Sequence, residues 1–191
     1  MVPKNGMVAD IIPGIQKKLN LDNETAKLIR IYEAHGGKVY KELMEDFNVT
    51  GVSEFVTLYA ERMPDDEINA TEDDRAIYCL HFDREPSKPH GVPFKFILKL
   101  HEQFKDTRVR LGKRTGIKGK LLEKMKFAIV SRSMYSKPRY LEEGDVLMDL
   151  IQDEDDMLGL DHVNKSRSFW NRGDSIFIRL SADQLLMAPS C

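Results

Sequence analysis

KFAIV at residues 126–130 forms a short apolar run, and two further strings follow it, LGLDH at 158–162 and SIFI at 175–178. An apolar run of this length is typical of a buried β-strand. Gly159 in the second string predicts a turn, in which both leucines pack and Asp161 accepts hydrogen bonds from local backbone donors. The third string is expected to stand apart as an apolar segment of a tail. None of the three carries reaction chemistry of its own.

The residues before KFAIV predict a hairpin followed by a broken helix. Residues 75–82 are largely apolar on both faces, which is typical of a central strand, and residues 94–100 form a second strand. A helical region follows over residues 104–122, and glycines at 112, 116 and 119 divide it. Hairpin, helix and strand in this order are typical of a β-grasp, in which a mixed sheet wraps one helix.

The first third of the chain repeats part of this pattern. Residues 7–21 carry an apolar helical stripe that starts properly near Pro13, and two strands flank a turn at Gly36 and Gly37. A third strand is expected over residues 55–59, and the acidic stretch 65–74 is interpreted as a module boundary. Only about six residues precede the first predicted helix, and these are too few for two strands. We therefore expect the first module to lack its opening hairpin.

The expected fold class is therefore α+β. It comprises a partial module over residues 1–74, a second module over 75–163 and an extended tail over 164–191. With 41% hydrophobic and 31% charged residues, the chain has the composition of a globular protein. No stretch approaches the roughly 20 apolar residues of a membrane span, and the start has no apolar signal core, so an intracellular location is expected.

Charge is segregated along the chain although the net charge is only −2. Nine Lys and Arg against two acids lie between residues 105 and 126, and eight acids with no base lie between 142 and 156. Arg108, Arg110 and Arg114 are the candidate contact residues of the basic segment, which forms either a solvated face or a surface that docks an acidic protein. Nucleic acid is disfavoured as the ligand, because no aromatic side chain for base stacking lies between Phe104 and Phe127.

Candidate residues for catalysis, cofactor binding or metal binding do not emerge. Cys79 and His81 point to the same face of a buried strand, so Cys79 is interpreted as a core residue rather than a nucleophile. The five histidines share no i,i+4 spacing and the chain has no CxxC pair, so no zinc site is predicted. The acids at 153–156 are interpreted as a hydrated surface loop, and no cofactor is expected.

Residues 8–178 resemble the last two ubiquitin-like modules of the herpesvirus-associated ubiquitin-specific protease family, in particular its fungal and plant members. The resemblance is carried by KLIRIYE at 27–33, HF at 81–82, GVPF at 91–94, KFAIV at 126–130 and LGLDH at 158–162. It implies tandem ubiquitin-like β-grasp modules that belong to a deubiquitinating enzyme, in the nucleus and cytoplasm.

In the family these modules do not cleave anything. The resemblance implies that they fold back on the catalytic domain of the same polypeptide and bind proteins of the ubiquitin pathway. A short Ile-x-Ile segment near the end switches that domain to its active arrangement, and Ile176, Phe177 and Ile178 match it. Trp170 is either an anchor for the tail or an exposed interface residue. The chain lacks the cysteine and histidine boxes of the protease, so its membership of an enzyme rests on the resemblance alone.

A second hypothesis stays open at this stage. The chain could act as a stand-alone ubiquitin-like adaptor that uses its basic face to bind an acidic protein or nucleic acid. The adaptor hypothesis needs no catalytic domain in the same polypeptide, whereas the protease hypothesis requires one.

Overall fold

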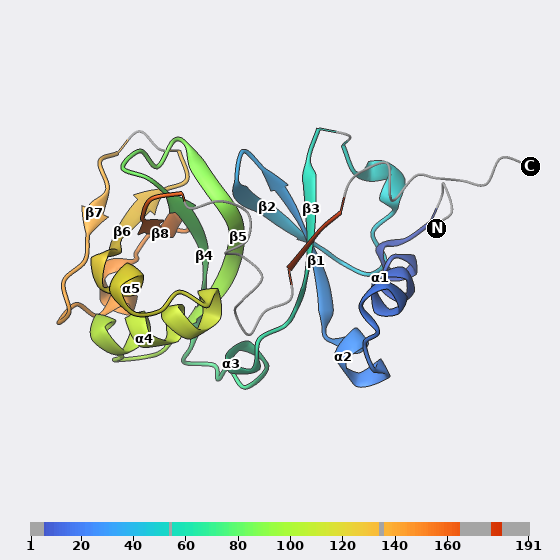
Figure 1. The fold of residues 1–191 in the computed structure, drawn as a ribbon, viewed down its shortest axis with the longest axis horizontal. Coiled ribbons are helices and arrows are strands. Elements are labelled where there is room, and N and C mark those ends of the chain that lie inside the picture. Colours follow the sequence, from blue (N-terminus) through green and yellow to red (C-terminus); the bar gives the residue numbers. More distant parts are fainter. Residues whose placement is uncertain (1–5, 54, 134–135, 165–176, 181–191) are drawn as a thin grey trace, which may run out of the picture. The chain divides into compact units, whose positions relative to one another are not determined.

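The computed structural model describes residues 6–53, 55–133, 136–164 and 177–180, which fold into two compact units. Unit 1 contains the described residues of 6–35, 39–63 and 177–180, and unit 2 contains those of 36–38 and 64–164. Each unit combines helices with one sheet, so the fold belongs to the α+β class (Figure 1). Within the described residues, no helix is both long and apolar enough to span a bilayer.

Unit 1 has a four-stranded sheet in the order β2-β1-β3-β9 (Figure 1). Its β1–β3 and β3–β9 pairs are antiparallel. The elements in chain order are η1 (Val8–Asp10), α1 (Ile12–Leu19), α2 (Asn23–Lys27), β1 (Ile29–His35), β2 (Lys38–Leu43), η2 (Val49–Gly51), β3 (Thr57–Arg62) and β9 (Phe177–Leu180).

Local sequence signals explain where these elements begin and end. Pro13 lies in the first turn of α1, where no helical N–H is required, and Asn20 ends the helix in the left-handed conformation. Asp22 caps α2 by accepting a hydrogen bond from Thr25 N at 2.8 Å. Gly36 and Gly37 have φ values of 55° and 74° and turn the chain from β1 into β2. The helix and the hairpin predicted from the sequence are therefore confirmed.

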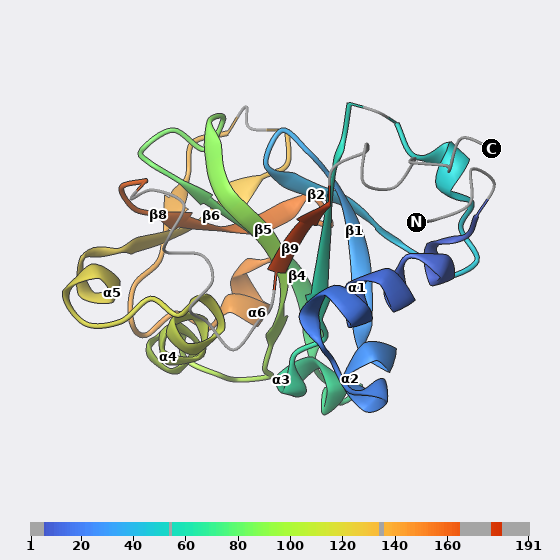
Figure 2. The same cartoon turned by 45° about the vertical axis from the view of Figure 1, so that its right-hand side comes forward.

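The core of unit 1 lies between α1 and one face of the sheet (Figure 2). Its buried members are Val8, Ile11, Ile15, Ile29, Ile31, Leu43, Val49, Leu58 and Ala60. The third strand was expected over residues 55–59, but β3 runs from Thr57 to Arg62. The shift follows from burial, because Leu58 and Ala60 enter the core whereas Phe55 is 83% exposed.

Unit 2 has a five-stranded mixed sheet in the order β5-β4-β8-β6-β7, in which the β4–β8 pair is parallel. A hairpin of β4 and β5 opens the sheet, and α4 separates that hairpin from β6. The elements are α3 (Asp65–Ile68), β4 (Arg75–Phe82), β5 (Pro89–Leu98), α4 (Phe104–Thr115), α5 (Lys120–Lys124), β6 (Lys126–Ser131), β7 (Arg139–Tyr140), α6 (Leu147–Leu150) and β8 (Asp156–Asp161).

Both faces of this sheet are buried, which confirms the prediction that residues 75–82 form a central strand. On one face Phe127 packs edge-on against Phe104 of α4, with ring centroids 5.1 Å apart. The other face carries a separate apolar cluster made of Leu80, Phe82, Ala128, Val130 and Met157. The divided helical region is also confirmed, because Gly116 ends α4 with a φ of 71°.

The turn predicted at LGLDH is wrong, because residues 156–161 form β8 between β4 and β6. Gly159 serves close packing rather than a turn. A Cβ atom on Gly159 would lie 2.6 Å from Cε1 of Phe82, so only glycine allows the ring to approach β8. The acceptor role of Asp161 is also not local, since it accepts hydrogen bonds from Arg84 N at 2.9 Å and Tyr140 Oη at 2.8 Å.

Candidate functional site

The segment that resembles the activating Ile-x-Ile sequence lies on the sheet of unit 1. Phe177 pairs with Glu61, and Ile178 pairs with Ala60, in the antiparallel β3–β9 register. Ile176 and Trp170 lie outside the described residues. The sequence pattern predicts a tail beyond both modules for this segment, whereas the structure makes residues 177–180 the edge strand next to β3. Without β9, the backbone groups of β3 on that side would lack these ladder partners.

Arg110, a predicted contact residue for an acidic partner, is held by groups of unit 2. Its guanidinium donates to both carboxylate oxygens of Glu102 at 2.9 and 2.6 Å and to the Ile97 carbonyl oxygen at 2.8 Å. It also pairs with Asp66 at 3.1 Å and lies over the ring of Phe96. Burial alone would raise the pKa of Glu102, but the hydrogen bonds from Arg110 and Thr107 lower it.

The other two predicted arginines differ in exposure. Arg114 is only 6% exposed and lies 5.2 Å from the ring centre of Phe94. Arg108 donates to the Leu122 carbonyl oxygen at 2.8 Å and lies 3.6 Å from the Glu143 carboxylate. The structure thus gives these arginines contacts within unit 2, and their role in partner binding stays a prediction.

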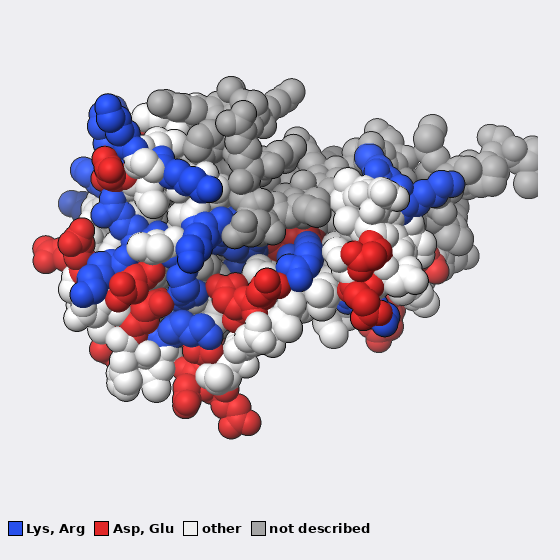
Figure 3. Space-filling view, turned by 60° about the horizontal axis from the view of Figure 1, so that its bottom comes forward, with Lys and Arg blue, Asp and Glu red and all other residues white. Residues whose placement is uncertain are grey.

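The charged side chains around these arginines are mixed in sign. Figure 3 shows Lys and Arg interspersed with Asp and Glu on the face in view, rather than gathered in one continuous basic field. The ion pair between Arg108 and Glu143 is one example, since it joins the basic segment to the acidic segment that begins at residue 142. The fold therefore brings together some basic and acidic side chains that lie in separate segments of the sequence.

Cys79 is a core residue, as predicted. It is 1% exposed on β4, and burial raises the pKa of its thiol far above the ordinary value. A buried neutral thiol is a weak nucleophile, so the environment of Cys79 is that of a structural cysteine. Within the described residues, no group of three or more His, Cys, Asp or Glu side chains is arranged to hold a metal ion.

Three histidines far apart in sequence come together at one end of the unit 2 sheet. His81 lies on β4, His90 on β5 and His162 directly after β8. Their ring centroids are 4.9 to 6.1 Å apart. Sequence reasoning missed this cluster, because only the pairing of β4 with β5 and β8 brings the three side chains together.

Hydrogen bonds to carbonyl groups determine the tautomers of this cluster. His162 Nδ1 is 3.1 Å from the Val163 carbonyl oxygen, and His90 Nε2 is 3.0 Å from the His162 carbonyl oxygen. A carbonyl only accepts, so both nitrogens carry hydrogen, and neutral His162 then uses Nε2 to accept from His81 Nδ1 at 2.9 Å. Burial, followed by the neighbouring imidazoles, lowers the pKa of His81 well below its usual value. The pKa of His162 is lowered as well, chiefly by burial.

Unit 1 contains a buried ionic network that the sequence analysis also missed. Glu61 is fully buried and accepts from Arg30 Nε at 2.9 Å, Arg30 Nη2 at 2.6 Å and Tyr32 Oη at 2.5 Å. The alternation of Arg30 and Tyr32 with Ile29 and Ile31 could have indicated it, because the polar pair faces away from α1. The network joins β1 to β3 next to the β9 pairing.

Comparison with known proteins places this architecture in a family. The family model described as "Ubiquitin-specific protease C-terminal" matches residues 1–167. The chain belongs to this family. It is 32% identical over 182 residues to ubiquitin carboxyl-terminal hydrolase 15 of Schizosaccharomyces pombe, covering 94% of this chain and 16% of that protein.

Other relatives of the family give the same result. Ubiquitin carboxyl-terminal hydrolase 5 of Schizosaccharomyces pombe is 24% identical over 164 residues, which is 86% of this chain and 15% of that protein. Ubiquitin C-terminal hydrolase 13 of Arabidopsis thaliana is 28% identical over 177 residues, which is 86% of this chain and 16% of that protein. The chain thus spans about a sixth of the length of these relatives, and the resemblance inferred from the sequence is confirmed.

Proposed function

We propose that this chain is a non-catalytic regulatory and docking region of a ubiquitin-specific protease, built from ubiquitin-like β-grasp modules. Family membership carries the proposal, and the fold of unit 2 supports it. A hairpin, a helix on one face and a central parallel pair of first and last strands are the features of a β-grasp, and unit 2 has all three. Membership also favours this function over a stand-alone adaptor.

Unit 1 supports the same proposal with one difference. After α1 its three strands β1, β2 and β3 follow in the order in which β6, β7 and β8 follow α4. In unit 2 the opening strand β4 lies beside the last strand β8, and in unit 1 β9 lies beside β3. The β4–β8 pair is parallel and the β3–β9 pair is antiparallel. Residues 177–180 therefore occupy the sheet position of an opening strand without reproducing its direction.

We further propose that the segment with Ile176, Phe177 and Ile178 activates a catalytic domain in the same polypeptide, in the nucleus or cytoplasm, where ubiquitin-pathway proteins would be partners. Residues 177–180 use one backbone edge to pair with β3. They cannot at the same time use that edge to bind in an apolar groove of another domain. Activation would therefore require the β3–β9 pairing to open, or the segment to be recognised while it stays in the sheet.

The experiment uses a polypeptide that joins this chain to its protease domain and measures hydrolysis of a fluorogenic ubiquitin substrate. Ile178→Asp and deletion of residues 175–191 should both lower turnover. Each change removes apolar surface that the segment would bury in a groove of the catalytic domain. Arg179→Asp in the same strand is the matched control and should retain more activity. Unchanged turnover in both the Ile178→Asp and deletion proteins would refute the activating role, and circular dichroism would verify that the units remain folded.

A further inference from the structure

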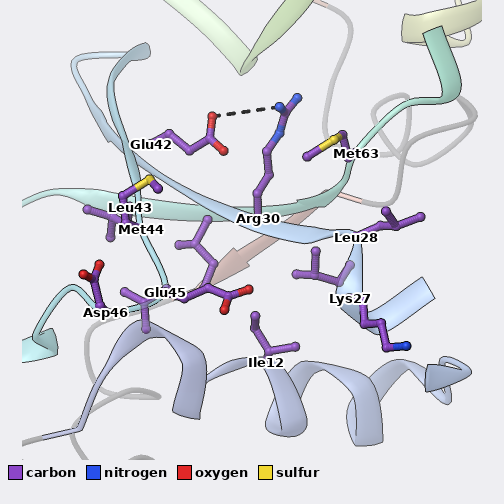
Figure 4. A pocket seen from close by; sticks show the side chains of 13 residues that line it. Ile12, Lys27, Leu28, Arg30, Glu42, Leu43, Met44, Glu45, Asp46 and Met63 are labelled. Atoms are coloured by element: carbon purple, nitrogen blue, oxygen red, sulfur yellow. Dashed lines mark ion pairs between the residues drawn. The ribbon is translucent and has the colours of Figure 1, made fainter. Parts of the chain in front are cut away.

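Unit 1 has a pocket of about 420 Å³ between α1 and the ends of β1 and β2 (Figure 4). Its floor is the apolar core, since Val8, Ile29, Ile31 and Leu43 contribute to the lining. Half-buried Ile12, Leu28 and Met63 form the walls. The volume lies within the range of about 300–1,000 Å³ that is typical of ligand pockets. An apolar side chain that entered here would be desolvated against the core of unit 1.

The rim of the pocket is acidic and carries one exposed apolar side chain. Glu45, Asp46 and Met44 are among the lining side chains drawn in Figure 4, in which Glu42 faces Arg30 as its ion-pair partner. Met44 is 68% exposed, which is unusual for a methionine beside a core. Methionine adapts its shape to different apolar ligands, so it suits the entrance of a binding pocket.

The basic residues of the lining are already matched by acids of unit 1. Arg30 Nη2 is 2.6 Å from Glu61 Oε1, and Lys27 Nζ is 2.7 Å from Glu24 Oε1. In contrast, neither Glu45 nor Asp46 has an ion-pair partner among the residues that the structure describes. The rim therefore presents negative charge to whatever enters the pocket.

The rim is anchored to the fold. Val8 N donates to the Phe47 carbonyl oxygen at 2.9 Å, and Ala9 N donates to the Glu45 carbonyl oxygen at 3.0 Å. On the opposite side Met63 N donates to the Leu28 carbonyl oxygen at 2.8 Å. These backbone hydrogen bonds hold both sides of the opening in place, so a ligand would not have to order them.

We propose that this pocket docks a short peptide segment of a partner protein, with one large apolar side chain in the pocket and Lys or Arg residues against Glu45 and Asp46. The apolar floor selects the anchor, and the acidic rim selects its basic neighbours and repels acidic segments and nucleic acid. The proposal goes beyond the proposed function, because it involves neither β9 nor a catalytic domain.

The test uses the whole chain, ¹⁵N-labelled, and a seven-residue synthetic peptide with a central leucine between two lysines on each side. Binding should shift the amide signals of Leu28, Met44, Glu45 and Met63. The same peptide with glutamates in place of the lysines should bind much more weakly. No binding of the lysine peptide, equal binding of the glutamate peptide, or shifts confined to unit 2 would each overturn the proposal.

Two variants test the two halves of the site. Reversal of both rim charges, Glu45→Lys with Asp46→Lys, should lower the affinity for the lysine peptide by about tenfold. This is the loss expected when two exposed charge pairs are removed and repulsion is added. The matched control is Glu72→Lys with Asp73→Lys, which changes net charge equally on exposed residues of unit 2 and should leave affinity unchanged. Met44→Trp should alter affinity without unfolding, because Met44 is exposed. Equal affinity for the rim variant and its control would overturn the proposal.

Discussion

Replacement of Glu61 by leucine should destabilise unit 1 severely. The carboxylate of Glu61 is fully buried and accepts two hydrogen bonds from Arg30 and one from Tyr32. The Arg30 side chain is only 4% exposed, and its other carboxylate neighbour, Glu42, lies 3.9 Å away. Glu61→Leu therefore removes a counter-charge at 2.6 Å from a guanidinium that is almost fully buried.

The expected magnitude follows from this burial. Removing one partner of a buried ion pair costs about 3–5 kcal/mol, because the remaining charge stays desolvated. Replacing both partners, as in Arg30→Met with Glu61→Leu, removes that charge and should cost far less than the sum of the single substitutions. A double-mutant cycle should therefore give a large favourable coupling energy between Arg30 and Glu61.

The measurement is urea unfolding followed by NMR signals of unit 1, so that the free energy of unfolding of this unit is obtained separately. The exposed pair Lys27–Glu24 is the matched control, since its N–O distance of 2.7 Å is nearly the same but its side chains are 70% and 81% exposed. Glu24→Leu should leave the unfolding free energy nearly unchanged. If Glu61→Leu costs no more than Glu24→Leu, burial is not what makes the Arg30–Glu61 pair important.

Three further predictions concern unit 2. Gly159→Ala should lower its unfolding free energy by about 1–3 kcal/mol through overpacking against an aromatic ring, whereas Gly144→Ala, with open space around it, should not; urea midpoints compare the two. Because burial lowers the pKa of His81 in the folded state, the unfolded state binds more protons, so stability is retained above about pH 6.5 and falls as the pH drops below it. His81→Asn should reduce this loss between pH 7.5 and 5.5 in unfolding measurements, and a pH profile identical to that of the unsubstituted protein would contradict the burial argument. Arg110→Lys should cost about 1–3 kcal/mol by thermal unfolding, because lysine cannot keep the two-pronged contact with a carboxylate, and an unchanged midpoint would show those hydrogen bonds to be dispensable.

The sequence by itself determined the local elements and the family. Helical stripes, the glycine pair at 36–37 and the apolar run at 126–130 are short-range signals, in which neighbouring residues decide the backbone conformation. They located α1, the β1–β2 hairpin and β6, and they predicted the hairpin of unit 2, although its second strand β5 spans Pro89–Leu98 rather than residues 94–100. Family membership was also readable, because the strings that carry it are local in sequence.

Tertiary structure alone decided the pairing of strands distant in sequence. A glycine within LGLDH favours a turn when only its sequence neighbours are considered, whereas close packing against Phe82 requires that glycine in a central strand. The histidine cluster, the Arg30–Glu61 pair and the pairing of residues 177–180 with β3 all join residues far apart in the chain. Such contacts depend on which surfaces meet after the strands assemble, and the sequence near each residue does not specify that partner.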